Sequence, residues 1–313
     1  MSESVAVLDI GSSSVKAGWA GDDVPSLIFP SVLSNSFKKD IESVEADVRG
    51  SAALADEFIS PIQRGIVKDW KKMESLLQIT FDKLGVSPGD SVSVLVAESP
   101  RTTPGDRMIL ADLLFEKFAV PSISIGNSAS LSVFAAGRTS GVVVEMGAGL
   151  TSVVPVYEGL ALTHASIPTE YGGQDISAAL LRLFADKGVS MDMSVARYLK
   201  ERMSFLLPTA QEPRSREKKT FVLPDGNEVT VDNSIFSDCT TSMFANERSN
   251  NGGVGATTFE ALMLCDESIR KDISQHIILA GGTSMLPGNS MIRFKMRRLG
   301  FIVCLLGLLV SFI

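Results

Sequence analysis

Two short glycine-containing turns carry residue types that could hold a phosphate. The first follows the apolar run of residues 5–8 and contains Gly11 and three serines, with Asp9 before it and Lys16 after it. Small residues let backbone N–H groups approach an anion closely, and Lys16 adds a positive charge. Asp9 could hold water on a metal ion that is bound to the phosphates. An ordinary hairpin with a Gly-Ser turn would look the same, so this turn alone leaves both interpretations open.

The second turn repeats the pattern later in the chain. Residues 141–150 again place an apolar strand before an acid, Glu145, and a glycine turn, and a second apolar run follows. Asp9 and Glu145 occupy equivalent places 136 positions apart (145 − 9), which is roughly one domain length. Two similar domains that each offer one glycine hairpin could clamp phosphates between them. A P-loop is excluded, because a strand rather than a helix follows the first turn.

The segments that must position these turns alternate between strands and helices. Strands are predicted near 5–8, 15–20, 91–98, 120–125, 141–146, 151–156 and 277–280, and helices near 70–84, 105–118, 128–136, 173–185, 194–205 and 257–265. The helix over 70–84 follows from an apolar stripe that includes Leu76, Leu77 and Phe81. The alternation favours an α/β fold with a largely buried sheet.

Composition limits the classes of function. The 313 residues suffice for two domains, and a net charge of −7 argues against a nucleic-acid-binding surface. The three cysteines lack metal-site spacing and there are only two histidines, which argues against a zinc site. The chain opens directly into its first strand with no secretory signal, so we expect a reducing, intracellular compartment.

Runs from Val5 to Gly288 resemble the actin family, and divergent actin-related proteins more than conventional actin. The runs are Asp9-Ile-Gly-Ser, Val15-Lys-Ala-Gly, Ala20-Gly-Asp-Asp-Val-Pro, Phe29-Pro-Ser, Gly65-Ile-Val-Lys-Asp-Trp, Phe115-Glu-Lys-Phe-Ala-Val-Pro, Ala136-Gly-Arg-Thr-Ser-Gly, Pro155-Val-Tyr-Glu-Gly, Leu223-Pro-Asp-Gly, Cys265-Asp, Ile269-Arg-Lys-Asp and Gly281-Gly-Thr-Ser-Met-Leu-Pro-Gly. The resemblance implies the two-lobed α/β fold of actin, Hsp70 and sugar kinases, with duplicated mixed-sheet domains and a nucleotide cleft between them. Residues 1–137 would form the first lobe, with a small insertion at about 32–68. Residues 138–290 would form the second, with an insertion at about 174–255, and an atypical apolar tail over 291–313 would replace the family's C-terminus.

The same resemblance implies ATP or ADP with Mg²⁺ or Ca²⁺ in the cleft. Carried over by position, the phosphate-binding residues would be Gly11, Ser12, Ser13, Lys16, Gly147 and Gly149, and the nucleoside-binding residues would be Gly173, Lys200, Glu201, Gly281, Gly282, Thr283 and Met285. Asp9 would order water on the cation. Without the family context, Lys200 and Glu201 would be interpreted as part of a solvated helix face.

The residues that would support hydrolysis depart from the family pattern. Ser128 stands where actins have a water-positioning glutamine, Glu145 and Ala148 stand at aspartate positions, and Ser152 stands at a histidine position. A serine cannot place water where a glutamine would, and general-base geometry is sensitive to such displacements. Losing ~2–3 kcal/mol of transition-state stabilisation slows a reaction by about two orders of magnitude. We therefore expect nucleotide binding with weak or absent turnover, and we assign no catalytic residue.

These departures favour a non-filament actin-related protein over a cytoskeletal ATPase that polymerises. The insertion between residues 31 and 60 is shorter than the actin segment that grips a neighbouring subunit, and a glycine- and asparagine-rich run replaces an actin contact region at 246–255. We expect a structural subunit of a chromatin-remodelling or dynactin-like assembly, in the nucleus or in the cytoplasm and cytoskeleton. Its partners would be protein subunits, such as actin or other actin-related proteins, and neither nucleic acid nor a membrane. A sugar kinase or chaperone would lack the actin-like runs.

The tail departs most from the family, which continues beyond Gly288 with a segment that returns to the first lobe. Residues 299–313 are apolar and follow three basic residues, but the run is shorter than the ~20 residues that span a bilayer. We expect an artefactual or alternative C-terminus, such as translated intron sequence. A membrane-associated tail and a core helix are the alternatives.

Overall fold

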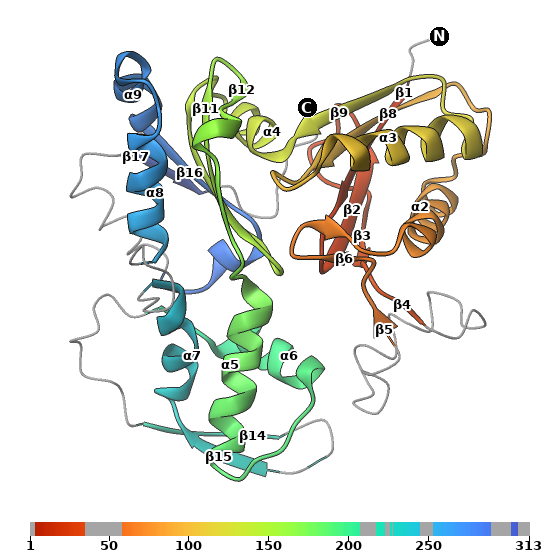
Figure 1. Ribbon diagram of the computed structural model, residues 1–313. Coiled ribbons are helices and arrows are strands. Elements are labelled where there is room, and N and C mark those ends of the chain that lie inside the picture. The colour runs from red at the N-terminus through yellow and green to blue at the C-terminus, as the bar shows by residue number, and fades with distance from the viewer. Residues whose placement is uncertain are drawn as a thin grey trace.

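The computed structural model describes residues 4–34, 58–206, 217–222, 226, 228–244, 253–288 and 302–305. Over these residues the chain forms two lobes, each built on a mixed sheet (Figure 1). Residues 35–57, residues 245–252 and most of the tail lie outside the described residues, so the expectations about subunit contacts there stay predictions. The two-lobed fold with duplicated sheets expected from the resemblance is confirmed.

The first lobe contains a five-stranded sheet in the order β3-β2-β1-β8-β9. Its strands are β1 (Ser4–Ile10), β2 (Ser14–Trp19), β3 (Leu27–Pro30), β8 (Val92–Glu98) and β9 (Ile123–Asn127). β1 pairs antiparallel with β2 and parallel with β8. Its apolar side chains pack against helix α2 (Trp70–Leu84) and helix α3 (Pro104–Asp112), which continues as the π-helical turn η2 (Leu113–Lys117).

The second lobe repeats this topology in a six-stranded sheet. Its strands are β10 (Gly141–Met146), β11 (Thr151–Tyr157), β12 (Leu160–Ala161), β13 (Ile167–Thr169), β16 (His276–Ala280) and β17 (Ile302–Leu305). The order is β12-β11-β10-β16-β17, with β13 also beside β11. As in the first lobe, an antiparallel hairpin is followed by two parallel strands, because β10 pairs antiparallel with β11 and parallel with β16. The backbone therefore shows the duplication that the two turns indicated.

A helical unit extends from the second sheet (Figure 1). Aromatic side chains form part of its core. It contains α5 (Gly173–Ala185), α6 (Met193–Met203), α7 (Ile235–Phe244) and the hairpin of β14 (Lys218–Val222) and β15 (Glu228–Asp232). Phe184 is fully buried, with ring centroids 5.9 Å from Phe221 and 6.0 Å from Phe236. Helices α8 (Val254–Met263) and α9 (Glu267–Ser274) pack against the second sheet.

Helix α4 (Ser128–Ala135) connects the lobes. The sequence assigned it to the first lobe, but its buried residues Ala129 and Val133 pack with Val143, Val154 and Ile278 of the second sheet. Its side chains therefore belong to the core of the second lobe. The helix begins at Ser128 because the Asn127 side chain accepts a hydrogen bond from the Ala129 N–H group, which caps its first turn.

Several local expectations needed correction. The strand expected at 120–125 begins only at Ile123, because the Val120 N–H group bonds to the Leu114 carbonyl and Ala119 has a positive φ of 50°, which end the preceding helix. Helices α7 and α9 were not predicted. Residues 302–305 form a strand beside β16 rather than a helix. No helix among the described residues is long and apolar enough to cross a membrane.

Four short strands lie between β3 and α2 in the chain and form two separate two-stranded sheets. They are β4 (Leu33–Ser34), β5 (Phe58–Ile59), β6 (Ile62–Gln63) and β7 (Ile66–Val67). β4 pairs with β5, and β6 pairs with β7 in a tight hairpin that leads into α2. Single turns of 3-10 helix occur at η3 (Thr163–Ala165) and η4 (Gly282–Met285).

Candidate functional site

The two glycine hairpins have the same backbone geometry. In the β1–β2 hairpin the Gly11 N–H group donates to the Ser14 carbonyl at 3.1 Å. In the β10–β11 hairpin the Gly147 N–H group donates to the Leu150 carbonyl at 2.8 Å, at the same positions of the turn. Each hairpin therefore presents two residues at its tip, Ser12-Ser13 and Ala148-Gly149. Short side chains at both tips leave the backbone accessible to a ligand.

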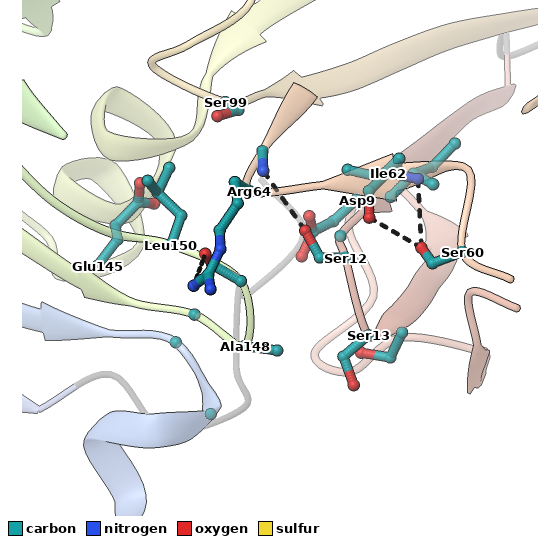
Figure 2. A pocket seen from close by; sticks show the side chains of 18 of the residues that line it. Asp9, Ser12, Ser13, Ser60, Ile62, Arg64, Ser99, Glu145, Ala148 and Leu150 are labelled. Carbon is teal, nitrogen blue, oxygen red and sulfur yellow. Dashed lines mark hydrogen bonds between the residues drawn. The ribbon is translucent and has the colours of Figure 1, made fainter. Parts of the chain in front are cut away.

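The two tips touch across the cleft between the lobes. A Cβ atom on Gly149 would lie 2.8 Å from the Ser12 Oγ atom and 3.2 Å from the Arg64 backbone nitrogen. A Cβ atom at position 149 would fit only if Ser12 and the Arg64 backbone moved, so glycine permits this close approach. Figure 2 shows Ser12 and Ser13 on one side of the site and Ala148 and Leu150 on the other. The hairpins thus share one site although they lie in different lobes.

The acids that precede the two turns differ in their partners. Asp9 faces Lys16 across the β1–β2 pair, and the Lys16 Nζ atom lies 2.6 Å from the Asp9 Oδ2 atom. Glu145 faces Ser152 at the same register of β10–β11, so it has no cation in the equivalent place. Instead the Ser128 and Ser152 hydroxyls donate to Glu145 Oε2 at 2.9 Å and 3.4 Å.

Burial raises the pKa of Glu145 to about 7. Hydrogen bonds from Ser128 and Ser152 and the charge of Lys16 lower this pKa, while the negative charge of Asp9 raises it further. The desolvation of the carboxylate outweighs the two serine hydrogen bonds. Near neutral pH this carboxyl group is therefore divided between its protonated and ionised forms.

A second group of contacts lies where α5, α6 and η4 meet the second hairpin. The Thr283 Oγ1 atom donates to the Gly147 carbonyl at 2.9 Å, and the Gly173 N–H group donates to the same carbonyl at 2.9 Å. Gly281 has a φ of 85°, and a Cβ atom there would lie 2.5 Å from the Met146 carbonyl oxygen. The residue before η4 must therefore be glycine for the chain to turn under the hairpin.

Lys200 is buried with 7% of its surface exposed, so it does not belong to a solvated helix face. Its Nζ atom donates to the Gly173 carbonyl at 3.2 Å. Burial lowers the pKa of Lys200, while the neighbouring Glu201 opposes that shift. Glu201 is exposed and forms a 3.0 Å ion pair with Arg197 one helical turn earlier.

One cavity of about 1120 Å³ connects these groups. Its walls include Asp9, Gly11, Ser12, Ser13, Lys16, Ser128, Glu145, Gly147, Gly149, Ser152, Lys200, Glu201, Gly281, Gly282, Thr283 and Met285. Gly173 lies behind the wall, where it contacts Gly147 and Lys200 through its backbone, and Gln174 takes its place at the surface. The structure thus brings the residues selected from the sequence around a single cavity.

Sequence reasoning missed several polar lining residues, among them Arg64, Gln174, Ser177 and Arg197. Arg64 lies in the turn between β6 and β7, next to a run that resembles actin. Gln174 and Ser177 lie on the first turns of α5, and Arg197 lies on α6. Their neighbours in the sequence gave no signal, except that an arginine beside a glycine in a turn is unusual.

The site fits a nucleotide with a divalent cation better than a protein-only metal centre. Among the described residues no group of three or more His, Cys, Asp and Glu side chains could hold a metal ion. A cation at Asp9 would therefore need phosphate oxygens and water as its other ligands, which is how Mg²⁺ is commonly held. Lys16 and the two small-residue tips supply the positive charge and the backbone access that phosphate requires.

Comparison with protein families gives a match to the family described as Actin. The match covers residues 1–194 and 189–291, which together contain both hairpins, α5, α6 and η4.

Proposed function

Because the chain belongs to the actin family, we propose that it binds ATP or ADP with Mg²⁺ or Ca²⁺ in this cavity and hydrolyses it slowly or not at all. The observation that carries the proposal is the contact between two matching hairpins from different lobes, with Ser12 against Gly149. A triphosphate is long enough and anionic enough to engage both tips at once. Binding would then draw free energy from both lobes.

The phosphate end would be held by the hairpin tips. Gly11, Ser12 and Ser13 from the first lobe would face Gly147 and Gly149 from the second, and Lys16 would neutralise phosphate charge. Asp9 would orient water on the cation while it remains paired with Lys16. The nucleotide and its cation would supply the reactive phosphoanhydride. The protein would position the phosphates and neutralise part of their charge.

The nucleoside end would lie toward α6 and η4. Glu201 is exposed at the cavity wall and can accept a hydrogen bond from a ribose hydroxyl. Lys200 lies deeper and fixes the α5 N-terminus through Gly173. Gly282, Thr283 and Met285 line the cavity and would form the wall beside the base, and Met285 is about half exposed.

We expect weak hydrolysis because the side chains around Glu145 that would position water are short or apolar. Hydrolysis needs side chains that hold the attacking water in line with the phosphate. Ser128 and Ser152 are short, and both of their hydroxyls already donate to the Glu145 Oε2 atom. Ala148, at the tip of the same hairpin, offers no polar side chain. The site therefore has the features of binding without those of efficient water activation.

Calorimetric titration of the purified protein with ATP in Mg²⁺ tests the binding proposal. We expect saturable binding at one site per chain, and a loss of about tenfold or more in affinity for Lys16→Gln, because a charge-assisted hydrogen bond to phosphate is removed. Lys71→Gln, an exposed lysine on α2, is the matched control and should bind like the wild type. Absence of binding to ATP and ADP in both Mg²⁺ and Ca²⁺ would reject the proposal.

A turnover assay tests the proposal that the protein hydrolyses ATP slowly or not at all. Wild-type protein should release phosphate no faster than Glu145→Gln, which cannot act as a base. Clear turnover in the wild type that disappears in Glu145→Gln would show that Glu145 activates water, contrary to our proposal.

We also propose that the protein serves as a subunit of a larger protein assembly, in the nucleus or the cytoplasm, rather than as a filament former. The support is the resemblance to actin-related proteins and the short segment between residues 31 and 60. Purification from cells under mild conditions should recover it with a stable set of partner proteins, among which actin or other actin-related proteins would be informative. Sedimentation of the pure protein as filaments in ATP, Mg²⁺ and salt would favour the cytoskeletal alternative.

A further inference from the structure

A tight hairpin formed by β6 and β7 contacts both glycine hairpins. β6 and β7 pair with Gln63 opposite Ile66, so Arg64 and Gly65 are the two residues of the turn. Their φ angles are 51° and 74°, both in the left-handed region. Such turns prefer asparagine, aspartate or glycine at the first position, and arginine there is conformationally unfavourable. A strained residue at a cavity wall is a reason to look for a function of its side chain.

The Arg64 side chain crosses from the first lobe to the second. Its Nη2 atom lies 2.7 Å from the Asp175 Oδ1 atom, and Nη1 bonds to the other carboxylate oxygen of Asp175 and, at 3.1 Å, to the Gly149 carbonyl. Figure 2 shows Arg64 reaching toward the hairpin that carries Ala148 and Leu150. The hydrogen bond to Asp175 raises the pKa of Arg64, so the guanidinium stays charged.

The backbone of the same turn is packed against both hairpins. The Gly65 N–H group points at the Ser12 Oγ atom at 3.5 Å. A Cβ atom on Gly65 would lie 2.6 Å from Ser99 Oγ and 3.1 Å from Leu150 Cδ2. The turn is therefore closely packed against Ser99 of the first lobe and Leu150 of the second, and separation of the lobes would break its contact with Leu150.

A second arginine supports the first. Arg101, in the loop after β8 of the first lobe, forms a 3.0 Å ion pair with Glu170, which follows β13 of the second lobe. Its Nη1 atom also lies 3.4 Å from the Arg64 carbonyl oxygen. Two ion pairs between lobes thus lie side by side on the hairpin side of the cavity, linked through the backbone of Arg64.

We propose that Arg64 and Arg101 form a strap across the two lobes, and that opening of the strap sets the rate at which a bound nucleotide leaves. The inference rests on the proposed nucleotide binding. A nucleotide held by both hairpin tips can leave only when the lobes separate, and separation breaks the Arg64 bonds to Asp175 and Gly149. The Arg64 and Asp175 side chains are 35% and 25% exposed, so water weakens the pair without abolishing it.

Arg64→Asn is the most informative variant. Asparagine accepts the left-handed backbone of this turn better than arginine, so the hairpin itself should fold at least as well. Bound fluorescent ATP analogue, chased with excess ATP, should dissociate about tenfold faster than from the wild type, which corresponds to about 1.4 kcal/mol. Lys117→Gln is the matched control, because it removes an ion pair with Glu74 that lies wholly within the first lobe, and its dissociation rate should be unchanged.

Asp175→Asn tests the strap independently from the other side of the bridge. Asp175 also accepts the Gly172 N–H bond at the start of α5, and the asparagine oxygen can keep that cap. Dissociation should accelerate as in Arg64→Asn, and the double variant should be little faster than either single variant, because both remove the same bridge. A dissociation rate in Arg64→Asn equal to that of the wild type would overturn the strap.

Small-angle scattering without nucleotide separates failure of the strap from failure of nucleotide binding. The radius of gyration should increase in Arg64→Asn and stay at the wild-type value in Lys117→Gln. If no nucleotide binds, the proposed function fails, and this measurement alone decides whether the strap holds the lobes together. An unchanged radius in that case would reject the strap as well.

Discussion

At the scale of single residues, Glu145 is the group whose environment has the largest consequence. It occupies the place in β10 that Asp9 has in β1, but it faces Ser152 where Asp9 faces Lys16. A buried acid without a cation is most stable when protonated. The difference between the two hairpins is therefore one of charge as well as of side-chain length.

This environment predicts a pH-dependent stability. In the unfolded chain the pKa of Glu145 would be near 4.5, and in the folded protein it is about 7. Below the lower value the acid is protonated in both states. Between the two values the unfolded state loses its proton while the folded state keeps it. The free energy of unfolding therefore falls as the pH rises, until the folded state has also lost its proton above the upper value. Glu145→Gln should therefore gain stability over the wild type from pH 5 to pH 8.

Urea unfolding at several pH values measures that difference. Glu116→Gln, which removes an acid from the exposed surface of η2, is the control for loss of one charge and should show a nearly constant offset. A difference for Glu145→Gln that does not change with pH would contradict the assignment of a raised pKa.

Gly149 gives the second residue-level prediction. A methyl group at this position would press on Ser12 Oγ and on the Arg64 backbone, so Gly149→Ala should hold the two tips apart. We expect a loss of about tenfold or more in ATP affinity with a small change in melting temperature, since each lobe keeps its own core. Gly105→Ala, at a helical position with only an ordinary contact at 3.7 Å, is the control. Unchanged affinity in Gly149→Ala would show that the contact between the tips is not required.

At the scale of elements, α2 shows how the first sheet is held in place behind its hairpin. The helix begins at the Asp69 cap, whose side chain accepts a hydrogen bond from the Lys72 N–H group, and ends at Gly85 with a φ of 72°. Leu77 and Phe81 from its inner face are buried against Leu8 and Val96 of the sheet. The position of β1, and with it the first turn, depends on this packing.

We therefore expect Leu77→Ala to lower the free energy of unfolding by about 2–5 kcal/mol, the usual cost of a large cavity in a core. Leu77 is completely buried, whereas Lys71 on the same helix is exposed, so Lys71→Ala should change the free energy by less than about 0.5 kcal/mol. Denaturant titration measures both. Equal effects of the two variants would mean that α2 does not pack as described.

At the scale of the whole molecule, the site exists only while the lobes are together. Ser12, Lys16 and Arg64 come from the first lobe, and Gly149 and Asp175 come from the second. A ligand that contacts both lobes stabilises their association as well as each fold.

Nucleotide should consequently raise the thermal stability of the whole chain. With free ATP at 100 times its dissociation constant, linkage predicts about 2.7 kcal/mol of added stability. If the lobes unfold in separate calorimetric steps without ligand, we expect ATP and Mg²⁺ to merge them into one step. The same ATP concentration with Lys16→Gln should raise the melting temperature less. A stabilisation confined to one of two steps would show that the nucleotide contacts a single lobe.

Local patterns in the sequence were sufficient for the elements that carry the site. Each hairpin is encoded by a short apolar run, an acid and small residues, so both turns and the duplication could be recognised from adjacent residues. The same holds for α2, whose stripe and bounds follow from its own sequence. The helices α7 and α9 and the true start of β9 depended on packing and on the end of η2, which adjacent residues do not reveal.

Other properties arise only when distant residues meet. The pKa of Glu145 depends on burial and on Ser128, 17 positions away. The buried side chains of α4 pack with residues of the second sheet that lie far from them in the chain. Arg64 lies 111 positions from Asp175, so nothing near it in the chain marks it as a bridge. The sequence by itself, through its two hairpin patterns and its resemblance to actin, determined which residues we expect to hold a nucleotide. The tertiary structure decided which of them face one another, because charge, desolvation and lobe contact depend on distances through space.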